Sequence, residues 1–294
     1  MSTDTADVGV VVVTFNSAPE IAACLTSIND AATLPTHIVV VDNASADNTV
    51  AVIQESFPSV TLIRNSDNRY YAAASNQALR AVGGRCILLL NPDTVLAAGS
   101  IDALARFLDE HPDAAAVAPQ LIGPDGNAQR SVRRFPGLDT LWYDLTGLAF
   151  LFPRSPRFGR WRMHDFDPKV EQTIDQPMAS CLMIRREALE QIGLFDERYP
   201  MFFNDVDLCR RARATGYTIY YTPSVQVRHL GGASIRRRKV RMIWMGHTAY
   251  LRYLHRLYAD RPLHRACVWL TAPFVYLAAI VRSAWWGAIG RFFR

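Results

Sequence analysis

The sequence predicts an α/β fold with a mostly parallel central sheet in residues 8–118. Short apolar runs at residues 10–13, 38–41 and 86–90 each end abruptly in polar residues. Continuous apolar runs of this length are typical of strands that are covered on both faces of a sheet. Segments with helical patterns lie between the runs, and such alternation predicts βαβ units with parallel strands.

The predicted elements follow one another in a regular order. Polar residues precede or open three of the helices: Ser17 stands before Pro19, Ser45 and Asp47 precede the second helix, and Ser100 opens the fourth. Such residues are favoured at helix N-termini, where their side chains accept hydrogen bonds from free N–H groups and proline fits the first turn. We expect strands over residues 8–14, 37–42, 60–64, 86–90 and 114–118, and helices over residues 19–30, 47–57, 71–82 and 100–111.

Polar side chains gather at one edge of the predicted sheet. The first strand leads into Thr14 and Asn16, the second ends at Asp42, and the fourth leads into Asn91 and Asp93. Open α/β sheets bind ligands at the carboxyl ends of their strands. No glycine follows the first strand, which excludes a dinucleotide fingerprint and a phosphate-binding P-loop there. If a nucleotide binds at this edge, the charge of its phosphates would be neutralised by arginine and by a divalent metal on oxygen ligands, for which Asp93 is a candidate.

Size and charge divide the chain in two. Its 294 residues, 50% of them apolar, suffice for one large domain and an appendage, which we place at residues 1–235 and 236–294. The appendage has twelve Lys or Arg and one acid, a net charge of +11, so the first 235 residues carry −6 of the total of +5. The five cysteines lack metal-type spacing and indicate reduced thiols in a cytosolic setting. Residues 1–7 do not resemble a secretory signal.

The appendage is typical of a segment that associates with membranes. Its residues 266–281 contain no charged side chain, and Trp269, Trp285 and Trp286 lie in or near this run. These 16 residues, interrupted by Pro273, fall short of the ~20 that cross a bilayer. We therefore expect a peripheral or partly embedded helix at the cytoplasmic face, attracted to an anionic membrane surface. A packed helical hairpin with a solvated arginine face is the alternative, and nucleic acid is not an expected partner.

A second candidate site begins at residue 204. Its pattern predicts the start of a helix that carries two acids, Asp205 and Asp207. At about 100° per residue these side chains point roughly 200° apart, so only one can face a substrate. A carboxylate within reach of a substrate hydroxyl can act as a general base. Alternatively, both acids complement the helix dipole.

Several ordered blocks point to one family. They read Val-Val-Thr-Phe-Asn at 12–16, Val-Val-Asp-Asn-Ala-Ser at 40–45, Asn-Arg-Tyr-Tyr-Ala-Ala-Ala-Ser-Asn-Gln-Ala at 68–78 and Leu-Leu-Leu-Asn-Pro-Asp at 88–93. Later blocks read Gly-Leu-Phe-Asp-Glu at 193–197, Phe-Phe-Asn-Asp-Val-Asp-Leu-Cys-Arg-Arg at 202–211 and Val-Arg-His-Leu-Gly-Gly-Ala-Ser at 227–234. Over most of residues 8–234 the chain resembles the family 2 inverting glycosyltransferases. It is most similar to their rhamnosyltransferase-like branch, which acts on lipid-linked or cell-surface glycans.

The resemblance implies a glycosyltransferase-A fold, in which a Rossmann-like sheet with flanking helices binds a nucleotide-diphosphate sugar. By their positions in the family's blocks, the residues implied to bind the nucleotide are Thr14, Asn16, Asp42, Asn68 and Asn91. For Asp42 the alternative is a structural role, in which it opens an ordinary turn with Asn43.

The resemblance also implies the catalytic residues. Asp93 and His229 would bind Mn²⁺ or Mg²⁺, and imidazole suits Mn²⁺ better. A plain turn at residues 92–93 and a structural histidine are the alternatives. The family pattern selects Asp205 as catalytic base, which leaves Asp207 to cap the helix or to pair with Arg210 or Arg211.

Departures from the family pattern fall near the same sites. Asn204 stands where the family has glutamate, and loss of that charge would lower the pKa of Asp205 relative to the family. Tyr70 replaces a usual glycine, and Ser180 another small residue, so both could narrow the sugar pocket. The match fades between residues 130 and 175, an aromatic and basic insertion expected on the acceptor side. Within it, residues 138–152 could equally form an apolar helix packed on the core.

These observations predict a metal-dependent inverting glycosyltransferase. It would move a sugar, with rhamnose as a candidate, from a nucleotide-diphosphate donor to a lipid-linked or cell-surface glycan, including polyprenyl-linked acceptors. A sugar nucleotidyltransferase is the second hypothesis, but it needs a triphosphate loop after the first strand, where no glycine stands. The third is a non-catalytic, membrane-tethered glycan-binding protein.

Overall fold

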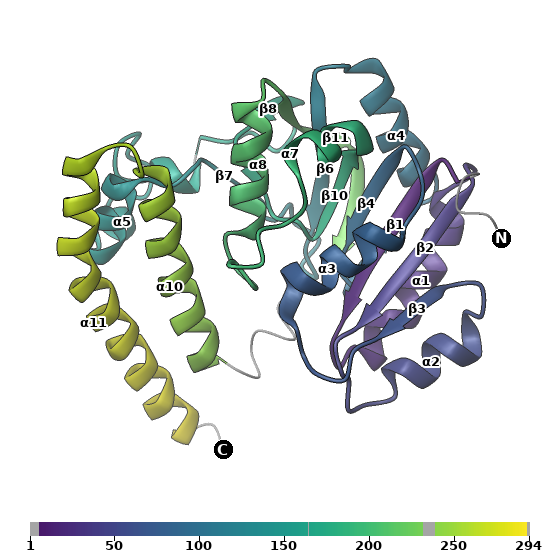
Figure 1. Ribbon diagram of the computed structural model, residues 1–294, viewed down its shortest axis with the longest axis horizontal. Coiled ribbons are helices and arrows are strands. Elements are labelled where there is room, and N and C mark those ends of the chain that lie inside the picture. The colour runs from purple at the N-terminus through teal and green to yellow at the C-terminus, as the bar shows by residue number, and fades with distance from the viewer. Residues whose placement is uncertain (1–5, 164, 232–238, 293–294) are drawn as a thin grey trace. The chain divides into compact units, whose positions relative to one another are not determined.

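The computed structural model describes residues 6–163, 165–231 and 239–292, shown as a ribbon in Figure 1. The chain forms two compact units. Unit 1 comprises residues 1–133, 167–200 and 204–231, and unit 2 comprises residues 134–166, 201–203 and 232–294. The boundary expected at residue 235 lies outside the described residues. Most of the expected insertion, residues 134–166, groups with the C-terminal helices in unit 2.

Unit 1 is built on a nine-stranded sheet in the order β3-β2-β1-β4-β10-β6-β11-β5, with β8 paired to β11. Strand β1 runs parallel to β2 and β4, and β2 runs parallel to β3. Strand β10 is antiparallel to both β4 and β6, so the sheet is parallel in its first half and mixed beyond it. The α/β class is confirmed. The strands are β1 (Val8–Thr14), β2 (Thr36–Asp42), β3 (Thr61–Arg64), β4 (Cys86–Leu90), β5 (Thr94–Leu96), β6 (Ala114–Ile122), β8 (Gln172–Ile174), β10 (Cys181–Arg185) and β11 (Thr218–His229).

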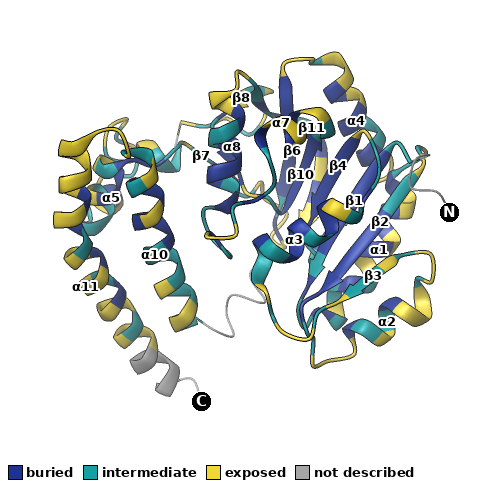
Figure 2. Cartoon of the chain, viewed as in Figure 1, coloured by how far each residue is buried: buried dark blue, intermediate teal, exposed yellow. Residues whose placement is uncertain are grey.

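Helices cover both faces of this sheet (Figure 1). One face of β1, with Val8, Val10 and Val12, packs in the main core cluster against Ile21 of α1 and Leu104 of α4. Helix α3 packs against β1 and β2. Figure 2 shows the central strands as mostly buried, which explains their unbroken apolar sequences. The helices of unit 1 are α1 (Ala18–Ala31), α2 (Thr49–Ser56), α3 (Tyr70–Ala81), α4 (Ser100–Glu110), α7 (Arg186–Ile192) and α8 (Asn204–Ala214).

The expected helix caps are only partly right. Ser17 is the N-cap of α1, but its side chain makes no capping bond, and its N–H donates to Thr49 Oγ1 at 2.8 Å. The N-cap of α2 is Asn48, although Asp47 Oδ1 accepts the N–H of Thr49 at 3.1 Å. Tertiary hydrogen bonds between the loops after β1 and β2 thus replace the local caps that the sequence favours.

Unit 2 is helical. The Tyr250 hydroxyl of α10 lies 3.0 Å from the Thr140 hydroxyl of α5, and the Trp142 ring of α5 contacts the Phe274 ring of α11 with centroids 5.4 Å apart. The single apolar helix that was one alternative for residues 138–152 is split by Gly147, which has φ 78°. The elements of unit 2 are α5 (Leu138–Leu145), α6 (Leu148–Leu151), the 3₁₀ turn η2 (Arg160–Arg162), α10 (Lys239–Leu257) and α11 (Pro262–Phe292). A separate two-stranded sheet of β7 (Val132–Arg133) and β9 (Gln176–Pro177) belongs to unit 1.

Candidate active site

The carboxyl ends of β1 and β2 are joined by side-chain hydrogen bonds. Thr14 and Asp42 are direct neighbours in the parallel register, and Thr14 Oγ1 donates to Asp42 Oδ1 at 2.9 Å. Asp42 also accepts the N–H of Ser45 at 3.0 Å and its hydroxyl at 2.5 Å. Both Thr14 and Asp42 are buried. Asp42 therefore fixes the turn after β2, and this shapes the edge of the sheet whether or not a ligand also contacts it.

The predicted asparagines hold the loops around this edge. Asn16 has φ 53°, and its Oδ1 accepts the N–H of Ala46 at 2.8 Å. Asn68 Oδ1 accepts the N–H of Tyr70, the first residue of α3, at 2.9 Å. Asn91, after β4, donates its N–H to the Ser180 carbonyl at 2.8 Å and its amide to Ser180 Oγ at 3.2 Å. Each of these residues lies at the predicted edge.

Asp93 and His229, which are 136 positions apart in the chain, meet at this edge. Strand β11 pairs with β5 so that His229 stands opposite Thr94, and the N–H of Leu230 donates to the Asp93 carbonyl at 3.0 Å. His229 Nε2 lies 3.5 Å from Asp93 Oδ1. The antiparallel pairing of β5 and β11 thus brings together the two residues that the sequence predicts as metal ligands.

Gln129 orients the His229 ring. Its Oε1 lies 2.8 Å from His229 Nδ1, and its Nε2 donates to the His229 carbonyl at 2.9 Å. An amide oxygen can only accept, so Nδ1 carries a proton, and in the neutral imidazole the lone pair is then on Nε2, the nitrogen that faces Asp93. This is the tautomer that a metal ligand needs.

The residues present fit a divalent metal that is only partly held by protein. Among the described residues, no group of three or more His, Cys, Asp and Glu side chains is arranged to hold an ion. One carboxylate and one imidazole nitrogen are nevertheless suitable first ligands for Mn²⁺. Metals of this kind commonly take their remaining ligands from substrate phosphates and water.

Asp205 lies beside the same edge. It is in the first turn of α8, next to the Ala179 backbone N–H. Ala179 precedes Ser180, which bonds to Asn91, and the Ala179 carbonyl lies 3.4 Å from the Tyr71 hydroxyl. The turn at residues 179–180 therefore connects Asp205 to the end of β4.

Burial raises the pKa of Asp205 to about 6, although hydrogen bonds from backbone N–H groups, that of Val206 first, act in the opposite direction. Asp205 as a whole is only partly buried. A carboxylate with a pKa just below neutral pH is ionised there and is still basic enough to accept a proton. Beside it, Asn204 Nδ2 is buried and has no hydrogen-bond partner among the described residues.

Asp207 has a structural role. It lies on the buried side of α8 and pairs with Arg211 at 2.8 Å. Arg211 also donates to the carbonyls of Ile192, Gly193 and Leu194 after α7. The predicted pairing of Asp207 is thus confirmed for Arg211, and this pair ties α8 to the end of α7.

Strained backbone surrounds this edge. Four residues other than glycine have positive φ beside the predicted sites: Asn16 (53°), Ala44 (62°), Tyr70 (61°) and Phe203 (67°). Such conformations cost of order 1–3 kcal/mol each and cluster where function requires a fixed geometry. Tyr70 occupies the position where the family has glycine, which explains why glycine suits that position.

Sequence reasoning missed Gln129, Ala179 and Tyr71. Gln129 lies in the loop after β6, and Ala179 lies just before β10. Ala179 reaches the site through the antiparallel strand β10, and Gln129 lies seven residues beyond the end of β6, so neither directly follows an apolar run as Asn91 does. Tyr71 stands in a quoted block, but no motif indicated that it approaches Asp205.

Comparison with known proteins agrees with this geometry. The family model described as glycosyl transferase family 2 matches residues 9–193. The chain belongs to glycosyltransferase family 2. It is 32% identical over 231 residues to the N-acetylglucosaminyl-diphospho-decaprenol L-rhamnosyltransferase of Mycobacterium tuberculosis, covering 75% of each chain. The family 2 chain is therefore a glycosyltransferase of the rhamnosyltransferase-like branch.

Solved structures share the fold of this glycosyltransferase. The mannosyltransferase PcManGT of Pyrobaculum calidifontis, in complex with GDP-Man and Mn²⁺, matches with a TM-score of 0.56 at 20% identity, over 97% of this chain and 78% of that one. TarS of S. aureus (residues 1–349), in complex with UDP, matches with a TM-score of 0.54 at 16% identity, over 83% of this chain and 65% of that one. The glycosyltransferase-A architecture is thereby confirmed.

Proposed function

We propose that this glycosyltransferase transfers a sugar, with rhamnose as first candidate, from a nucleotide-diphosphate donor to a polyprenyl-linked or cell-surface glycan with inversion. The observation that carries the proposal is the pairing of Asp93 with His229 at the carboxyl edge of the sheet, together with Asp205 beside the turn at residues 179–180 that bonds to Asn91. The similarity to a rhamnosyltransferase that acts on a decaprenol-linked substrate supports the sugar and acceptor class. The GDP-Man and Mn²⁺ complex of a protein with the same fold supports the donor and metal.

In this proposal each residue has a defined task. Thr14, Asn16, Asp42 and Asn68 shape the nucleotide site, with Asn91 at its floor. Asp93 and His229 hold Mn²⁺ or Mg²⁺, which when bound offsets the charge of the leaving diphosphate. Asp205 accepts the proton of the acceptor hydroxyl as that oxygen attacks the anomeric carbon from the face opposite the diphosphate.

A donor screen tests the proposed substrate class. Thermal unfolding is measured with Mn²⁺ and a panel of nucleotide-diphosphate sugars, because a ligand that binds only the folded state raises the melting temperature. The best donor is then incubated with a polyprenyl-diphosphate-linked acceptor, and the product is read by mass spectrometry. Stabilisation by a donor and gain of one sugar are expected; triphosphate-dependent formation of a nucleotide sugar would instead favour a nucleotidyltransferase.

Transfer should weaken in acid because Asp205 must be ionised. With the pKa of Asp205 near 6, kcat should fall about tenfold per pH unit on the acid side, to roughly a tenth of its plateau near pH 5. Asn204→Glu places a negative charge beside Asp205, which should move this limb upward by about half a unit to one unit. Asn204→Gln is the neutral control and should leave it in place; an unshifted limb in Asn204→Glu would contradict the assignment.

Gln129 should act on metal binding. Gln129→Leu removes the acceptor that holds the proton on His229 Nδ1, and loss of such an outer partner costs roughly 10–100-fold in metal affinity. Mn²⁺ affinity, measured by the EPR signal of free Mn²⁺ with nucleoside diphosphate present, should fall by that factor. Gln129→Glu keeps an acceptor oxygen and should retain most of the affinity. Equal affinity in Gln129→Leu and the wild type would contradict the role.

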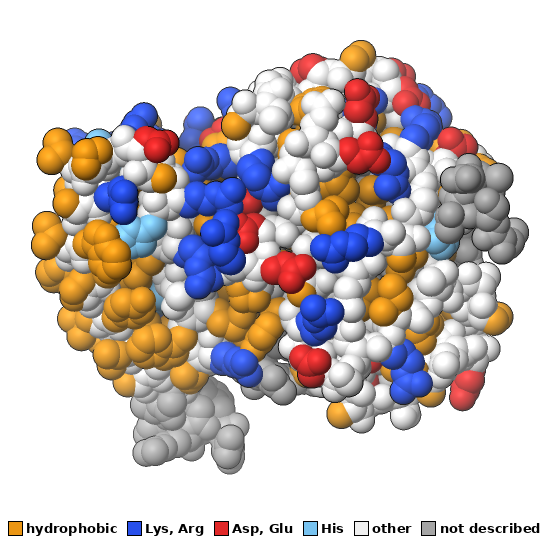
Figure 3. All heavy atoms as spheres, in the orientation of Figure 1, with side chains coloured by type: hydrophobic (Ala, Val, Ile, Leu, Met, Phe, Trp, Pro, Cys, Tyr) orange, Lys and Arg blue, Asp and Glu red, His pale blue; other side chains and the backbone are white. Residues whose placement is uncertain are grey.

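Helix α11 supports membrane association. Its buried side is a narrow stripe that includes Val268, Val275 and Ala279, whereas large apolar side chains elsewhere on it are exposed. Residues Pro262–Trp286 are long and apolar enough to cross a membrane by length and composition, longer than the charge-free run alone. Figure 3 shows hydrophobic side chains gathered over α10 and α11. We propose that the enzyme works at the cytoplasmic face of the membrane, peripheral or partly embedded through this helix.

Deletion of residues 263–294 should release the protein from membranes. The exposed apolar face of α11 is removed, while every predicted site residue lies in unit 1. Sedimentation with vesicles should therefore fall strongly, and donor binding with Mn²⁺ should be retained. A truncated protein that binds donor and sediments with vesicles as completely as the full chain would show that α11 is not the anchor.

A further inference from the structure

The short helix α6 ends in an exposed apolar tip. Phe150, Leu151 and Phe152 are 82%, 65% and 53% exposed, whereas Ala149 beside them is buried. Three consecutive large apolar side chains at the surface are a costly arrangement for a soluble protein and mark an interaction site. A packed helix over residues 138–152, one of the two alternatives for this segment, would bury these side chains, but they are exposed, although the Phe152 ring lies near Phe158.

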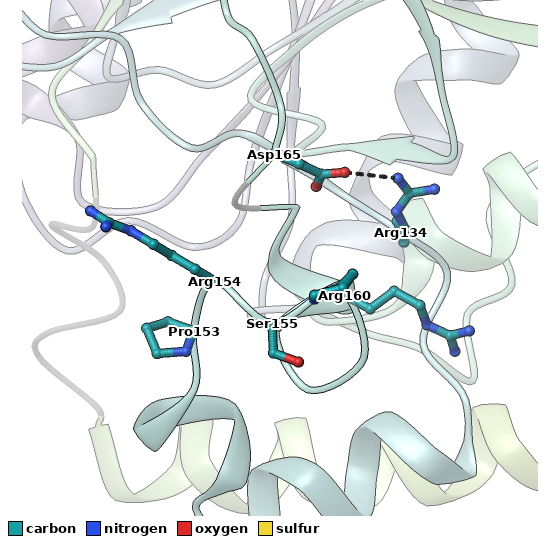
Figure 4. Close-up of a pocket in the computed structure, with 8 residues that line it drawn as sticks. Arg134, Pro153, Arg154, Ser155, Arg160 and Asp165 are labelled. Carbon is teal, nitrogen blue, oxygen red and sulfur yellow. Dashed lines mark hydrogen bonds and ion pairs between the residues drawn. The ribbon is translucent and has the colours of Figure 1, made fainter.

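A basic hollow follows the apolar tip directly. Residues 150–160 contain Arg154, Arg157 and Arg160 and no acid. A hollow of about 200 Å³ is lined by Arg134, Arg154 and Arg160, with Asp165 as its acid. Figure 4 shows Arg134 paired with Asp165, whereas the Arg154 side chain extends away from the other labelled side chains. Among the described residues, none forms a hydrogen bond or ion pair with that guanidinium.

Hydrogen bonds and packing within residues 152–159 hold the basic hollow next to the apolar tip. Ser155 Oγ accepts the N–H groups of Arg157 and Phe158 at 3.3 and 3.2 Å. The N–H of Gly159 donates to the Ser155 carbonyl at 2.8 Å, and a Cβ on Gly159 would lie 1.8 Å from the Pro153 carbonyl. The Phe158 ring packs near Phe152, with centroids 5.9 Å apart. The loop is therefore closed tightly, and the free arginine stays two residues from the tip.

We propose that residues 150–160 are a second membrane contact, in which the apolar tip enters the bilayer and Arg154 binds a phosphate of an anionic lipid headgroup. This inference rests on the membrane association proposed above and deepens it. Guanidinium groups match phosphate geometry in their fork of N–H donors. Arg160 pairs with Asp139 at 2.9 Å and Arg134 with Asp165 at 3.4 Å, which leaves Arg154 as the hollow's unneutralised arginine. An apolar tip beside such an arginine matches the boundary between acyl chains and anionic headgroups. A protein partner would not combine an acyl-chain region for the tip with a phosphate beside Arg154.

Vesicle flotation of the full chain tests this contact. The triple variant Phe150→Ser, Leu151→Ser, Phe152→Ser should bind less to phosphatidylcholine vesicles and to vesicles that also contain phosphatidylglycerol. Arg154→Gln should lower binding to the anionic vesicles alone by about fivefold, the ~1 kcal/mol per arginine converted at 1.4 kcal/mol per tenfold. Arg154→Lys should keep most of it. Arg80→Gln, an exposed arginine of α3, is the matched control and should change nothing.

A site-specific probe keeps the test independent of α11. A spin label on Leu151→Cys, in a Cys267→Ser background because Cys267 is exposed, should become more accessible to oxygen than to a water-soluble nickel chelate when vesicles are added. A label that stays in water, or flotation of the triple variant equal to wild type, would overturn the inference. Donor binding with Mn²⁺, which these variants should not alter, reports on the proposed function separately.

Discussion

Asp205→Asn should abolish most sugar transfer and at the same time stabilise the protein. Loss of a general base costs typically 10²–10⁴-fold in rate. In the folded protein burial raises the pKa of Asp205 from 3.8 to about 6. The folded state therefore favours the protonated form, and ionisation of Asp205 destabilises it. This destabilisation is absent below about pH 4 and is fully present above about pH 6. A neutral asparagine avoids that cost, so the free energy of unfolding should rise by about 3 kcal/mol near neutral pH, at about 1.36 kcal/mol per unit of pKa.

Asp207→Asn is the matched control, two residues away in the same helix turn. It breaks a buried ion pair and leaves Arg211 without its carboxylate, which should lower the free energy of unfolding by about 3 kcal/mol. Transfer per folded molecule should stay within a few-fold of wild type. Both variants are compared by denaturant unfolding and by initial rates of transfer. Asp205→Asn should be more stable and nearly inactive, whereas Asp207→Asn should be less stable and active. If Asp207→Asn is the inactive one, the base has been assigned to the wrong residue.

Asp93→Asn should remove the dependence of transfer on metal. The Asp93 carboxylate lies 3.5 Å from His229 Nε2. Stabilisation of a leaving diphosphate by a divalent ion is worth several kcal/mol, so wild type should lose at least about 10³-fold in kcat when EDTA removes the metal.

Without EDTA, Asp93→Asn should already have the low kcat of wild type in EDTA, and EDTA should lower it no further. Asn91→Ala, at the same edge but outside the predicted metal pair, is the comparison: it should weaken donor binding and keep the response to EDTA. An Asp93→Asn enzyme that Mn²⁺ still activates as strongly as wild type would place the metal elsewhere.

The parallel half of unit 1 could be predicted closely from sequence. Strands β1 and β4 begin and end at the expected residues, because each is an unbroken apolar run covered on both faces. The polar residues that follow β1, β2 and β4 therefore share an edge, as parallel strands require. Strand β6 extends to Ile122, four residues beyond the expected end, because pairing with β11 continues past an irregularity near Thr222. Such pairing depends on partners far away in the chain.

The second half of the site needed both the family resemblance and the structure. The pairing of Asp93 with His229 depends on the antiparallel contact of β5 with β11, for which no local pattern exists. Gln129 reaches His229 from a loop after β6, with no motif to mark it. The resemblance named His229 and Asp205, whereas only the fold shows that burial raises the pKa of Asp205. The apolar tip on α6 was missed because its composition resembles that of a packed helix.

The most direct measurement is the position of Mn²⁺ in crystals grown with nucleoside diphosphate, located by anomalous scattering at the manganese edge. The proposed function predicts a peak in contact with the Asp93 carboxylate, His229 Nε2 and the diphosphate, with the Asp205 carboxylate facing the space beside the diphosphate. A manganese peak away from Asp93 and His229, or a diphosphate bound away from the carboxyl edge of β1, β2 and β4, would contradict it.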